Sequence, residues 1–335
     1  MWATLILDID RYYRWARVPG IAVLAPLLLM AGRRPTDLLS STDYRAMRDF
    51  EPLLSDFEAN HLIFSAISEK RPFMAGKIGS TELRSLVRFQ AYESRDWLER
   101  IWSNLSRLEP VWRNASNFRR LKTHSGVFPI SSESLLQFFL ELQTALEQLD
   151  LLASWVPGEN KIFEGKRLSV STLRGIEPFF QPKPWTLALT GQRVLVVHPF
   201  RDTITLQWQK RRHLFDRPSV LPDFDLQIVK APQTLGGFSE EFQSWSKALE
   251  YTNELIAQRS FDVALVGCGS YSLPIARRIK EMGRPVVVMG GQLQLLFGIK
   301  GKRWDGSRLY KESWIRPLRS DKPPGFRGAD GGAYW

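Results

Sequence analysis

The segment 261–291, FDVALVGCGSYSLPIARRIKEMGRPVVVMGG, constrains the fold most, because it predicts a strand, a glycine turn, a helix and a second strand in succession. The apolar run 263–266 is short, partly β-branched and followed by glycines. Pro274 suits the first turn of a helix that ends at Gly283. A second β-branched run, 286–288, also ends at glycines. Helix N-termini and bare backbone N–H groups converge at the carboxyl ends of such strands, so this β–α–β unit favours an anion or nucleotide site there.

The rest of the chain predicts the same class. Strands are expected at 194–197 and 224–230, and an amphipathic helix at 238–258. Residues 71–87 indicate a short buried strand, a tight turn and a new helix, within a first half that is otherwise mostly helical. We therefore expect an α/β fold, with a Rossmann-like, doubly wound, mostly parallel sheet and a helical N-terminal half.

The first 40 residues differ from the remainder. Residues 18–32 carry no charge and are flanked by arginines and aromatics, but a stretch of 15 residues is shorter than the roughly 20 that span a membrane. Two readings stay open: a segment lying in a headgroup layer, or a helix packed on the domain or at a dimer seam. The expected divisions are an N-terminal segment 1–40, for which membrane association is one of these two readings, and an α/β domain 41–335. The domain consists of a helix-rich first half 41–190, a Rossmann-like second half 191–304 and a C-terminal tail 305–335.

The charge balance indicates an anionic partner. The formal net charge is +11, which suits an acidic lipid surface, a phosphorylated substrate or nucleic acid. The basic residues are scattered and form no run of five or six, which disfavours nucleic acid. The single cysteine excludes an intramolecular disulfide, and the histidines show no spacing typical of zinc sites.

The first candidate site is GKIGSTELRSL. Gly79 allows a tight turn after the strand, and Ser80 or Thr81 can cap the helix that follows. This arrangement leaves backbone N–H groups free for a phosphate, and Lys77 adds positive charge. Glu82 is either a surface carboxylate that compensates the helix dipole or a functional group, as a general base or metal ligand.

Two further candidates follow predicted strands. The turn with Gly267, Gly269 and Ser270 lies between a strand and a helix, although it lacks the full spacing of a dinucleotide-binding or P-loop motif. His198 ends its strand, where a side chain is well placed for a ligand pocket, and a core or supporting role is the alternative.

The fourth candidate is the basic loop, residues 298–303. Lys300, Lys302 and Arg303 are interleaved with glycines close to a predicted strand end. Three cations on a flexible loop can clamp a diphosphate, and a solvated basic turn is the alternative.

Taken together, KIGSTEL, VLVVHPF, FDVALVGCGSYSLPIARRIKEMG, GGQLQLLFGIKGKRW and the terminal GGAYW resemble a bacterial glycosyltransferase group of the GT-D fold, found among polysaccharide-assembly proteins. The resemblance covers roughly residues 45–335. It implies a Rossmann-like domain that transfers a sugar from a nucleotide-diphosphate sugar to a polysaccharide or lipid-linked acceptor. It also implies a cytoplasmic protein. Peripheral contact with the cytoplasmic face of the membrane is left open.

The family's turn resembles RFGDGE, in which Asp and Glu engage a metal and the sugar nucleotide. Here Lys77 falls on the family's Arg, Glu82 on its Glu, and Ser80 on its Asp. One carboxylate holds Mg²⁺ or Mn²⁺ poorly without further oxygens. Two alternatives follow: a divalent metal is held by Glu82 together with the diphosphate, or the cations of the basic loop replace it.

From the chemistry of that sugar transfer we assign a set of roles as a hypothesis. Glu82 acts as base or metal ligand, with His198 as a second candidate for the base. Contacts to the nucleotide and its phosphates are expected from Lys77, Gly79, Ser80, Thr81, Gly267, Gly269, Ser270, Lys300, Lys302 and Arg303. The alternative function is a non-catalytic nucleotide-sugar-binding accessory protein of polysaccharide assembly or export, which the serine at position 80 keeps open.

Overall fold

The computed structural model describes residues 53–93, 120–156, 158–163, 165–237, 239–307, 309–323, 326 and 330–335. The predicted N-terminal segment 1–40 lies outside these residues.

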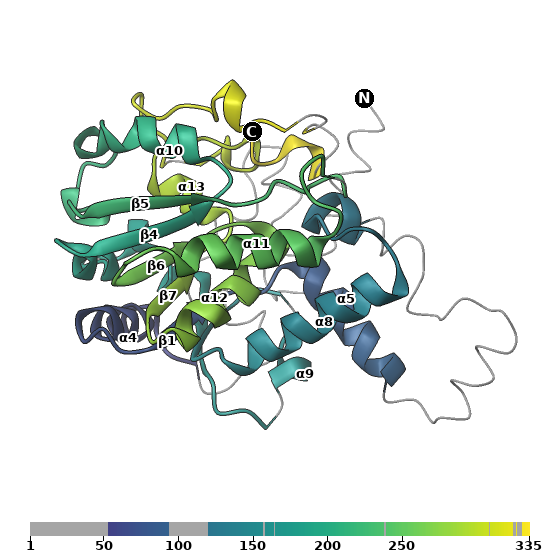
Figure 1. Ribbon diagram of the computed structural model, residues 1–335. Helices are drawn as coiled ribbons and strands as arrows, with labels where there is room; N and C mark the ends of the chain where they lie inside the picture. Colours follow the sequence, from purple (N-terminus) through teal and green to yellow (C-terminus); the bar gives the residue numbers. More distant parts are fainter. Residues whose placement is uncertain are drawn as a thin grey trace, which may run out of the picture.

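The core of the protein is one seven-stranded sheet, in which every strand is parallel to its neighbours (Figure 1). The strand order is β3-β2-β1-β7-β6-β4-β5. This confirms the predicted α/β class with a Rossmann-like parallel sheet. The strands are β1 Phe73–Gly76, β2 Leu151–Ser154, β3 Ser169–Thr172, β4 Arg193–His198, β5 Asp225–Lys230, β6 Val263–Val266 and β7 Pro285–Val288.

Helices cover both faces of the sheet, which explains why β1, β2, β6 and β7 are buried at every position. One core lies beneath α5, α8, α11 and α12, and Figure 1 shows the last three of these side by side. The second core lies beneath α4, α10, α13 and the C-terminal tail. The helices are α4 Asp56–Ser68, α5 Ser80–Glu93, α8 Ser132–Glu147, α9 Asn160–Phe163, α10 Arg201–Trp208, α11 Trp245–Ala257, α12 Ser272–Glu281 and α13 Gln292–Leu296.

Serine caps set the start of several helices. Ser55 forms a capping box with Glu58 at the start of α4. Ser131 caps α8 in the same way, without the reciprocal glutamate contact. Ser244 accepts a hydrogen bond from Lys247 N at 3.2 Å, and α11 therefore begins at Trp245 rather than at the predicted residue 238.

Both halves of the chain contribute to the same sheet. The first half, residues 41–190, supplies β1, β2 and β3, and the second half supplies the other four strands. The halves join where β1 pairs with β7, and Gly76 is opposite Val288 in the register. A Cβ atom at position 76 would lie 2.8 Å from Cβ of Val288, so glycine allows this close pairing.

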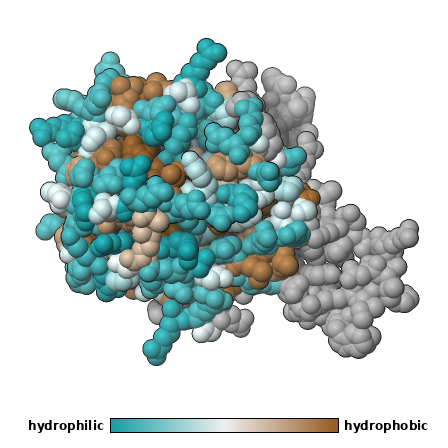
Figure 2. All heavy atoms as spheres, viewed as in Figure 1, coloured by the Kyte–Doolittle hydropathy of each residue, from teal (hydrophilic) through white to brown (hydrophobic). Residues whose placement is uncertain are grey.

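The face shown in Figure 2 is mostly hydrophilic, with apolar residues in small patches. Within the described part of the chain, every helix is too short or too polar to cross a bilayer.

Candidate functional site

The site lies where β1 and β7 end side by side. After β1 the chain enters α5, whose Leu83 and Leu86 pack into the first core. After β7 it enters α13, whose Leu293 and Leu296 pack into the second core, on the other face of the sheet. In open parallel sheets, ligands bind at carboxyl edges where the connections of neighbouring strands diverge in this way.

Lys77, the first residue after β1, is half-buried in this region. Its Nζ lies 4.9 Å from the ring centroid of Trp155, whose indole N–H donates to the carbonyl of Ile78 at 2.8 Å. On the other side is Gly290, with φ of 58°. A Cβ atom at Gly290 would lie 2.7 Å from Lys77 Cε. Gly290 therefore provides the space for the lysine as well as a left-handed turn.

Burial lowers the pKa of Lys77 from 10.5 to about 8, and the positive charge of Arg303 acts in the same direction. Glu177, Glu82 and Glu159 oppose these two effects and raise the pKa. Carboxylates that follow three different strands thus act on the charge of this ammonium. It stays mostly protonated at neutral pH and titrates within reach of physiological conditions.

Glu82 lies in the first turn of α5, and its carboxylate folds back over Gly79, where an added Cβ would overlap it. Burial raises the pKa of this carboxyl group. Its own backbone N–H, the hydroxyl of Ser125 and the charge of Lys77 act against that rise. A carboxylate with a raised pKa in a partly desolvated position is a suitable general base.

The C-terminal tail forms a third side of the site. Arg303 pairs with Asp330 and donates to the Tyr334 hydroxyl at 3.2 Å, with its guanidinium 4.7 Å from that ring's centroid. At Gly291, an added Cβ would lie 2.7 Å from the Trp304 ring and 2.8 Å from the Tyr334 ring. The terminal GGAYW motif therefore packs against the glycine pair that follows β7.

The hydroxyl of Ser270 forms hydrogen bonds within the chain. Its Oγ donates to the carbonyl of Ser125 at 2.6 Å and accepts from Trp245 Nε1 at 2.9 Å. These bonds fix the 121–129 segment against the turn after β6, and thereby place Ser125 and His124 beside Glu82. These bonds engage the Ser270 hydroxyl within the chain and disfavour its predicted contact with phosphate.

The two glycines of the same turn, Gly267 and Gly269, allow a closely packed turn next to the site. A Cβ atom at Gly267 would lie 2.6 Å from the carbonyl oxygen of Gly290 and 3.1 Å from the His198 ring. Its N–H donates to the carbonyl of Val197 at 3.0 Å, so this amide is not free for a ligand. Gly269 has a φ of 62°, which makes the turn into α12.

His198 is buried, and its hydrogen bonding disfavours the expectation that it could serve as a base. Burial lowers the pKa of its imidazole to about 3. Its Nδ1 accepts the backbone N–H of Phe200 at 3.0 Å, which leaves the proton of the neutral ring on Nε2. The nitrogen that would take up a proton already accepts this hydrogen bond, which favours the core or supporting role for His198.

The remaining predicted residues lie around the edge of the site. Ser80 and Thr81 are half-buried in the first turn of α5. Lys300 lies over the ring of Tyr310, with 5.8 Å from its Nζ to the centroid, and Lys302 is exposed. Of the three cations in the basic loop, Arg303 is the one that acts on the pKa of Lys77.

Glu82 is one carboxylate where the resembled turn has two, because Ser80 stands at the other position. The neighbours of Glu82 include the Lys77 ammonium and the Ser125 hydroxyl, and Mg²⁺ is usually bound by one or two carboxylates together with substrate phosphates and water. Within the described ranges, three or more histidine, cysteine or acidic side chains do not gather at any point that could hold a metal. A divalent metal held by Glu82 together with the diphosphate and its replacement by the cations of the basic loop therefore both stay open.

Sequence reasoning missed several residues of the site. Glu177 and Gln292 are joined by a hydrogen bond of 3.3 Å, and Tyr334 contacts Arg303. A tryptophan directly after an unrecognised strand, Trp155, also escaped notice. Two sequence signals could have identified some of them: Gln292 directly follows two glycines, and Tyr334 is an aromatic residue in the terminal GGAYW motif.

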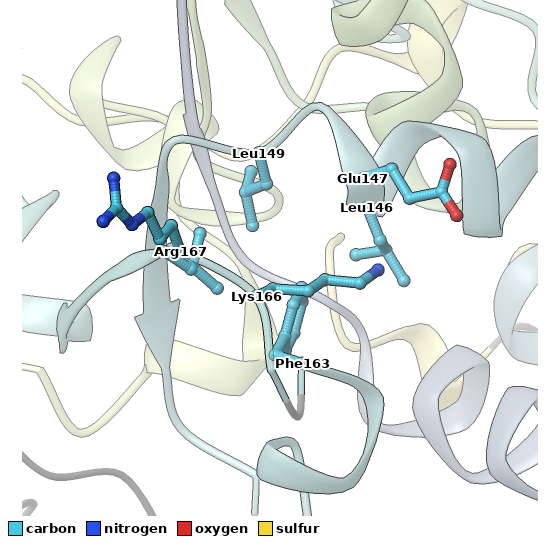
Figure 3. A pocket seen from close by; sticks show the side chains of 7 residues that line it. Leu146, Glu147, Leu149, Phe163, Lys166 and Arg167 are labelled. Carbon is cyan, nitrogen blue, oxygen red and sulfur yellow. The ribbon is translucent and has the colours of Figure 1, made fainter.

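A cavity of about 390 Å³ lies at the opposite, amino edge of the sheet (Figure 3). It forms between the end of α8 and the segment that leads from α9 into β3. Lys166 and Phe163 lie at its centre in this view, while Glu147 and Arg167 point outward on opposite sides. It shares no residue with the cluster around Lys77.

Comparison with known proteins adds no assignment: no protein-family model matches the chain, and no curated protein or solved structure matches it significantly.

Proposed function

We propose that the protein is a glycosyltransferase that moves a sugar from a nucleotide-diphosphate sugar to a hydroxyl of a polysaccharide or lipid-linked acceptor. The observation that carries the proposal is the cluster of Lys77, Glu82 and Arg303 where β1 and β7 diverge. It combines cations suited to a diphosphate with a carboxylate of raised pKa. The resemblance of the sequence motifs to the GT-D group supports the same activity, at the cytoplasmic face of a membrane.

In the proposed reaction, the acceptor oxygen attacks the anomeric carbon of the sugar and passes its proton to the Glu82 carboxylate. The bond between that carbon and the diphosphate oxygen breaks, and its electron pair stays on the nucleoside diphosphate. Negative charge therefore grows on the leaving group. Lys77 and Arg303 stabilise this charge, helped by the N-terminus of α5.

The alternative is an accessory protein that binds a nucleotide sugar without transferring it. The serine at position 80, where the resembled family has a carboxylate, favours this reading. Both functions predict nucleotide binding, so only sugar transfer to an added acceptor distinguishes them.

A thermal-shift screen against UDP-, GDP-, CMP- and dTDP-linked sugars tests the binding that both functions share. A ligand at a hundred times its dissociation constant adds about 2.7 kcal/mol to the free energy of unfolding. We expect a shift with one nucleotide class, measured with and without Mn²⁺. Unchanged melting curves with every donor would contradict the proposed function.

Replacing Gly290 by alanine is expected to weaken nucleotide binding beyond its effect on stability. The new Cβ would push Lys77 from its place beside Trp155. Gly283→Ala is the matched control, since Gly283 also has a positive φ, of 79°, but open space around an added Cβ. Both variants should lose roughly 1 kcal/mol or more of stability from backbone strain. Equal nucleotide affinity in the two variants would show that Lys77 does not contact the ligand.

A further inference from the structure

Glu177 and Gln292 form an acceptor-rich group beside the cations. Glu177 follows β3, Gln292 begins α13 after β7, and the amide of Gln292 donates to Glu177 Oε1 at 3.3 Å. The Glu177 side chain is 13% exposed, and its Oε2 lies 4.0 Å from Arg174 Nε. A Cβ atom added at Gly290 would lie 3.3 Å from Lys77 Nζ and 4.0 Å from Gln292 Oε1, so the pair lies beside the ammonium.

The amide oxygen of Gln292 is the feature that needs explanation. Gln292 is 8% exposed, and its Oε1 has no hydrogen-bond partner within the described part of the chain. A buried amide oxygen without a donor is unfavourable, and native proteins rarely leave one unpaired. Rotating the amide by 180° does not help, because the oxygen would then face the Glu177 carboxylate. The position therefore calls for a donor beyond the described residues, which a bound ligand can supply.

The charges and acceptors divide the site into two parts. Lys77 and Arg303 offer donors and positive charge, which suit phosphate oxygens. Glu177 and the Gln292 oxygen offer acceptors, which repel phosphate oxygens and suit hydroxyl groups. A ligand that satisfies both parts carries hydroxyl groups covalently joined to a diphosphate.

We propose that Glu177 and Gln292 recognise hydroxyl groups of the sugar that is transferred, while Lys77 and Arg303 hold the diphosphate. This inference rests on the proposed function and assigns the sugar end of its substrate. The two side chains act as specificity determinants: sugar hydroxyls donate to the Glu177 carboxylate and to Gln292 Oε1. A site built to hydrogen-bond a hydroxyl discriminates strongly against a ligand that lacks it.

The test compares the binding of three ligands by calorimetry: inorganic diphosphate, the nucleoside diphosphate of the class found in the screen, and its sugar-linked form. The variants are Glu177→Gln and Gln292→Met, which keep the side-chain size. We expect each to weaken binding of the sugar-linked form about tenfold or more, and to leave binding of the other two ligands within about twofold. Glu141→Gln on α8 and Gln227→Met on the edge strand β5 are matched controls.

The other outcomes overturn the inference in distinguishable ways. Equal losses for all three ligands would show that Glu177 serves only as a counter-ion for Lys77. Losses for both nucleotides but not for inorganic diphosphate would assign the pair to the ribose instead. Unchanged binding of the sugar-linked form in both variants would exclude any role in recognition. If the wild-type protein bound none of the three, the proposed function would fail together with this subsite.

Discussion

Replacing Glu82 by glutamine is expected to lower the rate of sugar transfer about 10²- to 10⁴-fold, the usual contribution of a positioned general base. Glutamine keeps the size of the side chain but cannot accept the proton of the acceptor hydroxyl. Nucleotide binding should persist, since Lys77 and Arg303 remain. The measurement is transfer from the donor identified by the screen to an added acceptor, together with the affinity for that donor.

The stability of Glu82→Gln should not fall along with its transfer activity. Burial raises the pKa of Glu82, so its ionised form is disfavoured in the folded protein. Ionisation of this group therefore lowers stability as the pH rises from the ordinary carboxyl value through the raised one. A neutral glutamine avoids that penalty, and we expect the melting temperature at pH 7 not to fall.

Glu133→Gln is the matched control for Glu82→Gln, because Glu133 lies in the first turn of α8 and is exposed. The same chemical change in a first helical turn should leave transfer unchanged there. Full transfer activity in a folded Glu82→Gln variant would rule out Glu82 as the base. A loss of donor affinity as large as the loss of rate would point to binding instead.

The sequence predicted the strands whose pattern is strong. Residues 263–266 and 286–288 are apolar and β-branched, and they form β6 and most of β7 as expected. β2 was missed because LLAS continues a leucine-rich helical segment and has high helix propensity. β3 was missed because SVST is short and polar, although its last three residues are buried. Sheet pairing, rather than local preference, decides the structure of these two segments.

The parts of the site that follow glycine turns were predictable from the sequence. The roles of side chains that depend on tertiary packing were less predictable. The turns at Gly79 and Gly290 were identified from their place after strands, and both lie beside Lys77 or Glu82. Ser270 and His198 had equally suitable positions in the sequence. Their polar atoms are taken up by Ser125 and by the backbone after β4, contacts that no local pattern reveals. Glu177 was missed for the same reason, because its partner lies 115 positions away in the chain.

Lys77 should give nucleotide binding an alkaline limit. Its pKa in the ligand-free protein is about 8, and a bound diphosphate favours the protonated form. Affinity should therefore fall about tenfold per pH unit above pH 8, until the higher pKa of the complex is reached. Lys77→Met should lose most of the affinity at every pH and show no such fall. Lys77→Arg should keep its affinity above pH 8, because a guanidinium stays protonated there.

Stability of the ligand-free protein should change in the opposite direction over the same range. Because the folded pKa of Lys77 lies below its ordinary value of 10.5, the charged form disfavours folding, and that penalty is present in full below pH 8. It is relieved as the pH rises from about 8 toward 10.5, by at most about 3 kcal/mol. The difference between the wild-type protein and Lys77→Met in urea unfolding at several pH values isolates this effect from other titrating groups.

Lys247→Met, on the exposed surface of α11, is the control for both measurements, and it should follow the wild-type curves. A wild-type affinity that stays constant between pH 7 and about 9.5 would mean that Lys77 does not hold the phosphates. A falling affinity without the matching rise in stability would assign the alkaline limit to a different group. A single half-buried lysine at the phosphates accounts for both trends, because its deprotonation removes the positive charge that binds the ligand and also removes the desolvation cost of that charge in the folded protein.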